Sequence, residues 1–463
     1  MHHTMIPLLS LALLVCCTSA GFAADWPPTI DTKNQTTRAL DGRTIERYVH
    51  GVQDKWGYPA PSDWTYHEAQ ETGAKQQNHS SFYVVSPLPP KSQRPLSVVL
   101  HSANRTAYDY LGFSCLNRKI DGGDDPATSM TNTPAEFYTL YLNSTNDEWW
   151  GWTQARQSPN FARHLNAPPP AEQRVLDTIE WVVTHYNIDR NRIYLCGTSM
   201  GGCGSLGIGL PHGDVFAAVL GNVPAGTAYA CYRLGGLSPL PAPDAPQTER
   251  DAWLKRAACV GLPDPPVLVD FSSQADGWSV TQPPLVSAAQ VGRLPLVLGW
   301  GPFGHPTFAS LIAKYPPCEV ALAFPWLEIR KNEAYPVFTH ASSDQHSPWL
   351  NAPAEYDDAG QMNAYFRWQN QQDTPASVTL QIWLAHPKIT NPKLPMPIAS
   401  TTDITLRRLQ QFKVHPGQTY TWQWTRDGKI IASRQVTPDA ANLLTIPQLS
   451  VTTVPATLTL HGK

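Results

Sequence analysis

The stretch NRIYLCGTSMGGCG at residues 191–204 constrains the fold of this chain more than any other segment. An apolar run at 193–196 leads directly into GTSMG at 197–201, which fits the pattern G-x-S-x-G. In that pattern the serine lies on a tight strand-to-helix turn, because the flanking glycines lack the Cβ atoms that would clash there. The stretch therefore predicts a buried strand, a sharp turn that exposes the Ser199 hydroxyl, and a helix that starts with small residues.

Strand and helix patterns alternate on both sides of this turn. Apolar side chains recur every three or four residues over 171–186, which predicts an amphipathic helix just before the turn. Short β-type runs predict core strands at 81–85, 96–100, 215–220, 267–271 and 294–299. Alternation of this kind builds a mostly parallel central sheet flanked by helices, so we predict an α/β fold.

The chain is long enough, at 463 residues, for about two domains. Residues 25–370 are expected to form the α/β domain, with a Pro/Gly-rich insertion at about 222–266 that contains one short helix at 249–260. From 371 to 463 the sequence changes to short alternating runs with an Asp427-Gly428 turn, which is typical of strands joined in hairpins. We expect a small, sandwich-like, C-terminal all-β domain there.

The first 24 residues resemble a secretory signal peptide. The apolar run Ile6–Val15 is too short to cross a bilayer, and small residues follow it at Ala20, Ala23 and Ala24, after which cleavage is expected. We therefore expect a secreted or periplasmic protein without a membrane partner. A net charge of −3 offers no reason to expect nucleic acid as a partner.

Removal of the leader leaves six cysteines, an even number that permits disulfides in an oxidising compartment. Their spacing does not fit a zinc site, so neither a metal nor another cofactor is expected. Cys196 lies inside the apolar strand and is predicted to be a small buried side chain.

A serine hydroxyl becomes a good nucleophile when a histidine accepts its proton and an acid orients that histidine. The loop after 267–271 offers Asp276 as the acid, with Asp270, inside the strand, as the alternative. The loop after 294–299 contains Gly304-His305, and the glycine allows that loop to fold back toward Ser199. Competing histidines, His340 and His346, follow the last expected core strand, and Asp264 precedes two prolines and is expected in a turn.

Chemistry at a carbonyl also needs two backbone N–H groups that stabilise the oxyanion. Met200, directly after the serine, is expected to supply one of them. Ser102 and Ala103, in the loop that follows the strand 96–100, are candidates for the other.

Over residues 80–310 these features resemble the α/β-hydrolase superfamily, and most closely its secreted feruloyl esterases, acetyl xylan esterases and polyhydroxybutyrate depolymerases. The resemblance rests on the helix-turn-serine block EQRVLDTIEWVVTHYNIDRNRIYLCGTSMGG and on the loops SSQADGW and GPFGHPTF. It implies an α/β-hydrolase fold and a Ser199–Asp276–His305 triad. The chain departs from the family in two places, with His101-Ser102 and Ser272-Ser273 where His-Gly is usual.

Tryptophans near the expected site bear on the substrate. Flat aromatic rings stack on sugar or aromatic faces, so we expect a binding platform made of Trp149, Trp150, Trp152, Trp278 and Trp300, with core packing as the alternative for each. The sequence hypothesis is thus a secreted serine esterase that acts on ester-bearing carbohydrate. A serine peptidase like prolyl oligopeptidase, and a non-catalytic carbohydrate-binding protein with a relic hydrolase domain, are the alternatives.

Overall fold

The computed structural model covers the chain, and its described residues are 28–30, 37–49, 81–89, 91, 93–103, 105–116, 129–143, 149, 170–224, 241–242, 244–257, 264–279, 283–306, 308–345, 359–390 and 394–462. The predicted leader, Trp150, Trp152 and His346 lie outside these residues.

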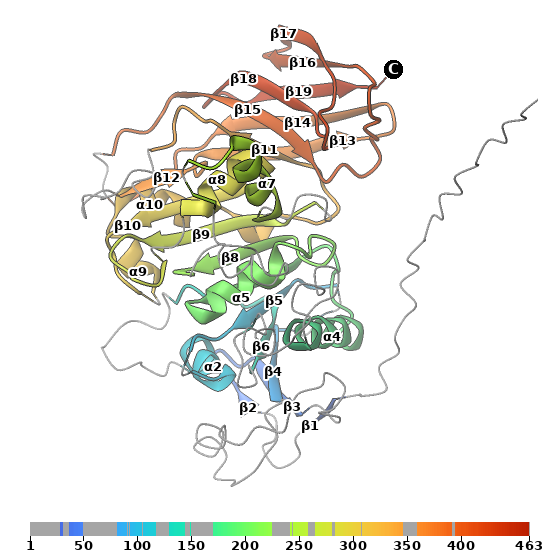
Figure 1. Ribbon diagram of the computed structural model, residues 1–463. Coiled ribbons are helices and arrows are strands. Elements are labelled where there is room, and N and C mark those ends of the chain that lie inside the picture. The colour runs from blue at the N-terminus through green and yellow to red at the C-terminus, as the bar shows by residue number, and fades with distance from the viewer. Residues whose placement is uncertain are drawn as a thin grey trace, which may run out of the picture.

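A large sheet of eleven strands forms the centre of the described structure (Figure 1). Its order is β1-β3-β4-β6-β5-β7-β8-β9-β10-β12, and β2 pairs with β3. The six strands from β6 to β10 in that order are parallel, whereas β1 to β4 and β12 add antiparallel strands at the two ends. The strands are β1 (Thr29–Ile30), β2 (Thr37–Arg38), β3 (Thr44–Val49), β4 (Ser81–Ser86), β5 (Leu96–Leu100), β6 (Tyr138–Leu142), β7 (Ile193–Thr198), β8 (Ala218–Asn222), β9 (Val267–Ser273), β10 (Leu296–Gly301) and β12 (Gly360–Met362).

Helices cover both faces of this sheet, because alternate side chains of each buried strand point to opposite faces. On one face Leu195 lies in a core with side chains of α4 (Pro170–His185), α5 (Met200–Gly209), α7 (Gln247–Ala257) and α8 (Pro283–Gly292). On the other face Cys196 lies in a core with α2 (Ala107–Cys115) and α10 (Pro316–Leu322), and α9 (Ala309–Ile312) packs beside α10.

The predicted fold class is confirmed, with differences in detail. Strand β8 begins at Ala218 rather than at 215, because residues 212–216 form turns before it. Strand β6 was not predicted, although its sequence YTLYL is β-type and every residue of it is buried. The helix expected at 249–260 is observed as α7 at Gln247–Ala257.

The C-terminal part of the chain forms two antiparallel sheets. One has the order β13-β14-β19-β16-β17, and the other has the order β11-β15-β18. Their strands are β11 (Tyr335–Thr339), β13 (Phe366–Asp373), β14 (Ser377–Leu384), β15 (Ala399–Arg407), β16 (Tyr420–Arg426), β17 (Lys429–Val436), β18 (Thr445–Thr452) and β19 (Ala456–His461). The compositional boundary at residue 371 lies inside β13; β11 belongs to the smaller sheet, and β12, which follows it, belongs to the central sheet.

The β part is attached to the central sheet at the amino ends of the parallel strands. Two arginines at the end of β15 make this contact: Arg407 pairs with Asp264, and Arg408 donates to the backbone carbonyls of Ala217 and Pro265, next to the starts of β8 and β9. Ser199, by contrast, follows the carboxyl end of β7. The β part therefore contacts the amino ends of β8 and β9, whereas Ser199 lies at the carboxyl ends of the parallel strands.

Among the described residues, Cys115, Cys196 and Cys318 are free, buried thiols, and Cys203 is buried as well. No helix in the described part of the chain is long and apolar enough to span a bilayer.

Candidate active site

Ser199 lies on a strained turn between β7 and α5. Its backbone has φ 59° and ψ −118°, a conformation that L-residues rarely adopt and that persists only where the surrounding structure enforces it. The Ser199 N–H donates to the carbonyl of Asn222 at 2.8 Å, and its carbonyl accepts from Cys203 N–H at 2.9 Å. Ser199 itself remains partly exposed, so a substrate can reach it.

The glycines of this turn are required by close backbone contacts. A Cβ at Gly197 would clash with the backbone of Gly201, and one at Gly201 would clash with the Leu100 carbonyl. Helix α5 therefore starts directly against the end of β5, and its first N–H groups lie beside the loop that follows β5.

The predicted acid and histidine are brought together at the same edge of the sheet. The Nδ1 of His305 and the Oδ2 of Asp276 are 2.6 Å apart, although the two residues are 29 positions apart in sequence. Burial by itself raises the pKa of Asp276, but hydrogen bonds from His305 and from the Trp278 backbone N–H more than offset it and lower that pKa. The carboxyl is therefore an ionised acceptor at neutral pH, and it fixes Nδ1–H as the donor so that Nε2 can accept a proton.

The His305 side chain is 41% exposed, whereas that of Asp276 is 9% exposed. There is no hydrogen bond between Ser199 and His305 in the described structure, which is common for catalytic pairs without substrate.

Three buried polar residues that sequence reasoning missed hold these loops in place. Ser273 accepts from the Gly304 N–H at 2.9 Å, and Ser279 donates to the Ser273 carbonyl at 3.0 Å, so the acid loop and the histidine loop are joined. Asn222 Nδ2 donates to the carbonyl of Pro306 at 2.8 Å and to the hydroxyl of Thr198 at 3.2 Å. Asn222 thus connects the residue before Ser199 with the residue after His305.

The loop after β5 is built around His101. Burial lowers the pKa of His101 to about 4, so its ring is neutral, and its Nδ1–H donates to the Ser102 carbonyl at 2.8 Å. The Arg105 N–H donates to the same carbonyl at 3.3 Å. A trans peptide directs its N–H opposite to its carbonyl, so the Ala103 N–H points away from the His101 ring.

Two of the tryptophans expected in the binding platform are core residues instead. Trp149 is 1% exposed, donates from Nε1 to the His101 carbonyl at 2.8 Å, and packs edge-on against the His101 ring. Trp300 is also 1% exposed, because β10 continues to Gly301 and directs this side chain into the core against Gly360. Neither ring has a face open to substrate, so the expectation of stacking was wrong for both.

Trp278, next to Asp276, is only partly buried and packs at the edge of the core. Trp150 and Trp152 lie outside the described residues, so their predicted role stays a prediction.

The alternative acids and bases have other partners. Asp270 is fully buried in β9 and accepts from the Ser272 hydroxyl at 2.5 Å. Asp264 pairs with Arg407, and His340 pairs with Asp403 in the small sheet at 3.1 Å. Among the described residues no group of three His, Cys, Asp or Glu side chains could hold a metal ion.

Sheet order, the strained serine turn and the acid–histidine pair together define an α/β-hydrolase fold. No protein-family model and no curated protein matches the chain. Solved structures resemble it at low identity. They include the fluorophosphonate-binding serine hydrolase F of Staphylococcus aureus, with 13% identity over 54% of this chain and 93% of that one, at a TM-score of 0.35. An S-formylglutathione hydrolase from Agrobacterium tumefaciens matches at 13% identity over 60% and 93% of the two chains, with a TM-score of 0.35. An acetyl xylan esterase from Aspergillus awamori matches at 14% identity over 46% and 72%, with a TM-score of 0.31.

Proposed function

We propose that this protein is a serine hydrolase that cleaves carboxylic esters through an acyl-enzyme. The observation that carries the proposal is the pairing of His305 with Asp276 at 2.6 Å, on loops that follow β9 and β10 at the edge of the sheet where Ser199 lies at φ 59°. Ser, Asp and His follow one another along the chain in the order typical of this fold.

In this mechanism the Ser199 hydroxyl oxygen attacks the ester carbonyl carbon while Nε2 of His305 takes the hydroxyl proton. Asp276 stays ionised, holds Nδ1–H and stabilises the imidazolium that forms. Collapse of the tetrahedral intermediate breaks the C–O bond, and His305 gives its proton to the leaving alcohol. Water, deprotonated by His305, then attacks the acyl-enzyme, which releases the acid and restores Ser199.

The oxyanion would be bound by two backbone N–H groups. Met200 is the first residue of α5, where N–H groups have no partner within the helix and the helix dipole favours negative charge. For the second donor the arrangement favours Ala103 over Ser102, because the Ser102 carbonyl is held against His101 and the Ala103 N–H points the other way.

For the substrate we propose an ester carried on plant polysaccharide, such as an acetyl or feruloyl ester, outside the cell. The predicted leader at residues 1–24 and the aromatic residue Trp278, two positions after the acid, support this proposal. The loss of Trp149 and Trp300 from the expected platform leaves recognition of the substrate to other residues.

Labelling by a fluorophosphonate probe, followed by hydrolysis of p-nitrophenyl acetate, methyl ferulate and acetylated xylan, tests the proposal. Ser199→Ala should abolish both labelling and hydrolysis. Asp276→Asn should lower kcat by about three to four orders of magnitude, because the wrong histidine tautomer is then favoured.

The matched control is Asp270→Asn, which should reduce kcat far less, because Asp270 contacts Ser272 and not His305. Hydrolysis that persists in Ser199→Ala would disprove the assignment, and faster turnover of peptides than of esters would favour a peptidase.

A further inference from the structure

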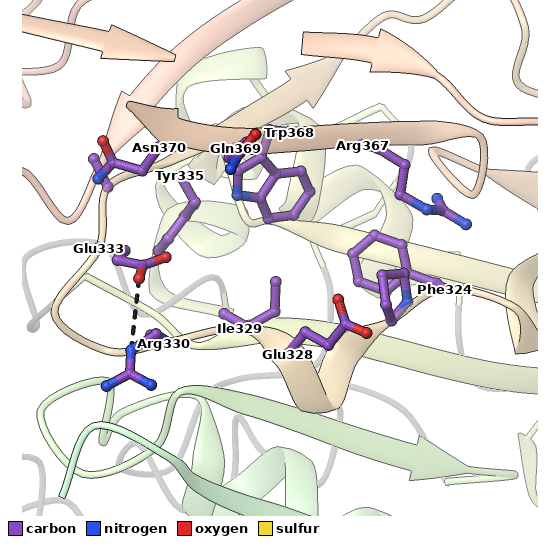
Figure 2. Close-up of a pocket in the computed structure, with 12 residues that line it drawn as sticks. Phe324, Glu328, Ile329, Arg330, Glu333, Tyr335, Arg367, Trp368, Gln369 and Asn370 are labelled. Atoms are coloured by element: carbon purple, nitrogen blue, oxygen red, sulfur yellow. Dashed lines mark ion pairs between the residues drawn. The ribbon is translucent and has the colours of Figure 1, made fainter. Parts of the chain in front are cut away.

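A cavity lies far from Ser199, between strand β13 and the segment that precedes β11. Its volume is about 260 Å³, close to the lower end of the roughly 300–1,000 Å³ typical of small-molecule sites. Figure 2 shows the Trp368 ring directed from β13 toward the opposite wall, which carries Ile329 and Glu328. The cavity therefore has the size for one or two ring-shaped units.

Its place in the fold separates it from the catalytic residues. The carbonyl of Ile329 accepts from the Tyr194 hydroxyl at 2.9 Å, and the Lys331 N–H donates to Asn191 at 2.8 Å. Asn191 and Tyr194 lie at the amino end of β7, whereas Ser199 follows its carboxyl end. A six-residue strand spans about 20 Å, so a ligand in this cavity does not touch the reacting atoms.

The aromatic wall is rigid and partly exposed. Trp368 is half-buried, and its ring packs at a tilt against Phe324, with centroids 5.8 Å apart. The Arg367 guanidinium lies 5.1 Å from the centre of the Phe324 ring and donates to the carbonyls of Ala364, Phe366 and Ala323. The Arg367 guanidinium is thus engaged by backbone carbonyls and by the Phe324 ring, and this packing holds the Trp368 ring in position without a ligand.

Polar side chains surround the opening. Within the described residues, no hydrogen bond is formed by the side chains of Glu328, Gln369 or Asn370, all of which line the cavity. Glu333 is half-exposed, and its Oε1 lies 3.5 Å from the Nε of Arg330 (Figure 2). Two carboxylates thus balance the two guanidiniums, which leaves no net charge to attract an ionic ligand.

We propose that this cavity is a non-catalytic binding site for a neutral sugar unit of a polysaccharide. An aromatic ring fits the apolar face of a sugar ring, and amide and carboxylate groups at the opening accept and donate hydrogen bonds to its hydroxyls. This site is independent of the proposed esterase activity. Where both hold, the protein contacts one polysaccharide, or two, at opposite edges of its sheet, so that binding here raises the local concentration of ester at Ser199.

The test is native affinity electrophoresis in gels that contain xylan, glucomannan or mixed-linkage β-glucan, each freed of esters by alkali. The unmodified protein should be retarded by at least one of them. Trp368→Ala should lower the association constant at least tenfold, and Glu328→Ala about threefold to fivefold. Ester-free polymers separate this result from the catalytic function, and Ser199→Ala should be retarded as strongly as the unmodified protein.

Glu249→Ala, at an exposed glutamate on α7, is the matched control and should be without effect. The exposed position of Glu328 keeps the test decisive even if Trp368→Ala unfolds. Migration unaffected by all three polymers would overturn the proposal. Retardation of Glu328→Ala equal to that of the unmodified protein would also overturn it, and so would equal retardation of a folded Trp368→Ala.

Discussion

At the scale of single residues, Asn222 has more influence on the candidate site than its position in the sequence indicates. It is fully buried at the end of β8, its carbonyl accepts from Ser199 N–H, and its side chain donates to Thr198 and to Pro306. Because Pro306 follows His305 directly, Asn222 sets the distance between the serine turn and the histidine loop. We infer that it is a positioning residue, without contact to substrate.

Asn222→Ala should slow the catalytic step while substrate binding changes little. Two neutral hydrogen bonds contribute about 1 kcal/mol each, so the loss of both predicts a fall in kcat of roughly 10- to 30-fold with KM nearly unchanged. Steady-state kinetics with p-nitrophenyl acetate and the rate of fluorophosphonate labelling measure this. Asn332→Ala, at an exposed asparagine, is the control and should leave kcat unchanged. A kcat of Asn222→Ala within twofold of that of the unmodified protein would show that Asn222 has no positioning role.

At the scale of elements, helix α5 packs so closely against its neighbours that four of its glycines, Gly201, Gly202, Gly204 and Gly209, leave no room for a Cβ. A Cβ at Gly204 would clash with Trp149, whose Nε1 supports the His101 carbonyl. Strand β5, helix α5 and the Trp149 side chain are therefore packed as one unit beside the candidate oxyanion loop.

Gly204→Ala should destabilise the protein by about 1–3 kcal/mol, the usual cost of overpacking a dense core. Chemical denaturation monitored by tryptophan fluorescence measures the change in the free energy of unfolding. Gly277→Ala is the control, because a Cβ there meets open space, and its effect should stay within about 0.5 kcal/mol. Equal stability of the two variants would contradict the close packing of α5.

At the scale of the whole molecule, the C-terminal sheets depend on two buried arginines for their attachment. Arg408 donates to the carbonyls of Gly213, Phe216, Ala217 and Pro265, and its guanidinium lies 5.1 Å from the centre of the Tyr335 ring. Those carbonyls lie at the amino edge of the central sheet, where bulk water does not replace a lost donor.

Arg408→Ala should therefore destabilise the protein by about 3 kcal/mol or more, because several buried acceptors lose their partner together. Differential scanning calorimetry should show a lower Tm, or a transition split into two as the β part uncouples. Arg434→Ala, at an exposed arginine on β17, should change the Tm by less than about 1 °C. If both variants melt alike, the attachment does not depend on Arg408.

Stability of the molecule should also depend on pH through Asp344. Burial raises the pKa of this carboxyl to about 7, and the N–H of Asn363, 2.8 Å from Oδ1, only partly offsets that rise. An unfolded aspartate has a pKa of about 3.9, so the folded state retains a proton that the unfolded state loses. The stability from this group is full below about pH 4 and falls as the pH rises to about 7.

Asp344→Asn should remove this dependence, because an amide oxygen accepts from the Asn363 N–H without a charge. The difference in Tm, variant minus unmodified protein, should increase by about 2 °C or more between about pH 4 and 7. Above that range it should stay constant. Melting curves over this range measure the difference, and a pH-independent difference would rule out a raised pKa at Asp344.

Features that depend on neighbours along the chain could be predicted from the sequence. The serine turn, the amphipathic helix before it and the order of serine, acid and histidine are local patterns, and the structure places Asp276 beside His305. Strand β6 was missed although its run YTLYL, like the runs of the predicted strands β5 and β9, is β-type and fully buried.

Tertiary structure alone decided which side chains are buried and which segments meet. Trp149 and Trp300 have aromatic rings that could stack on a sugar, but packing against His101 and Gly360 places both rings in the core. The bridge from Asn222 to Pro306 joins residues 84 positions apart, a contact that no local pattern encodes. Periodicity and turn chemistry are properties of neighbouring residues and so determined the class of fold and the elements, whereas burial and long-range contacts exist only after the sheet has formed.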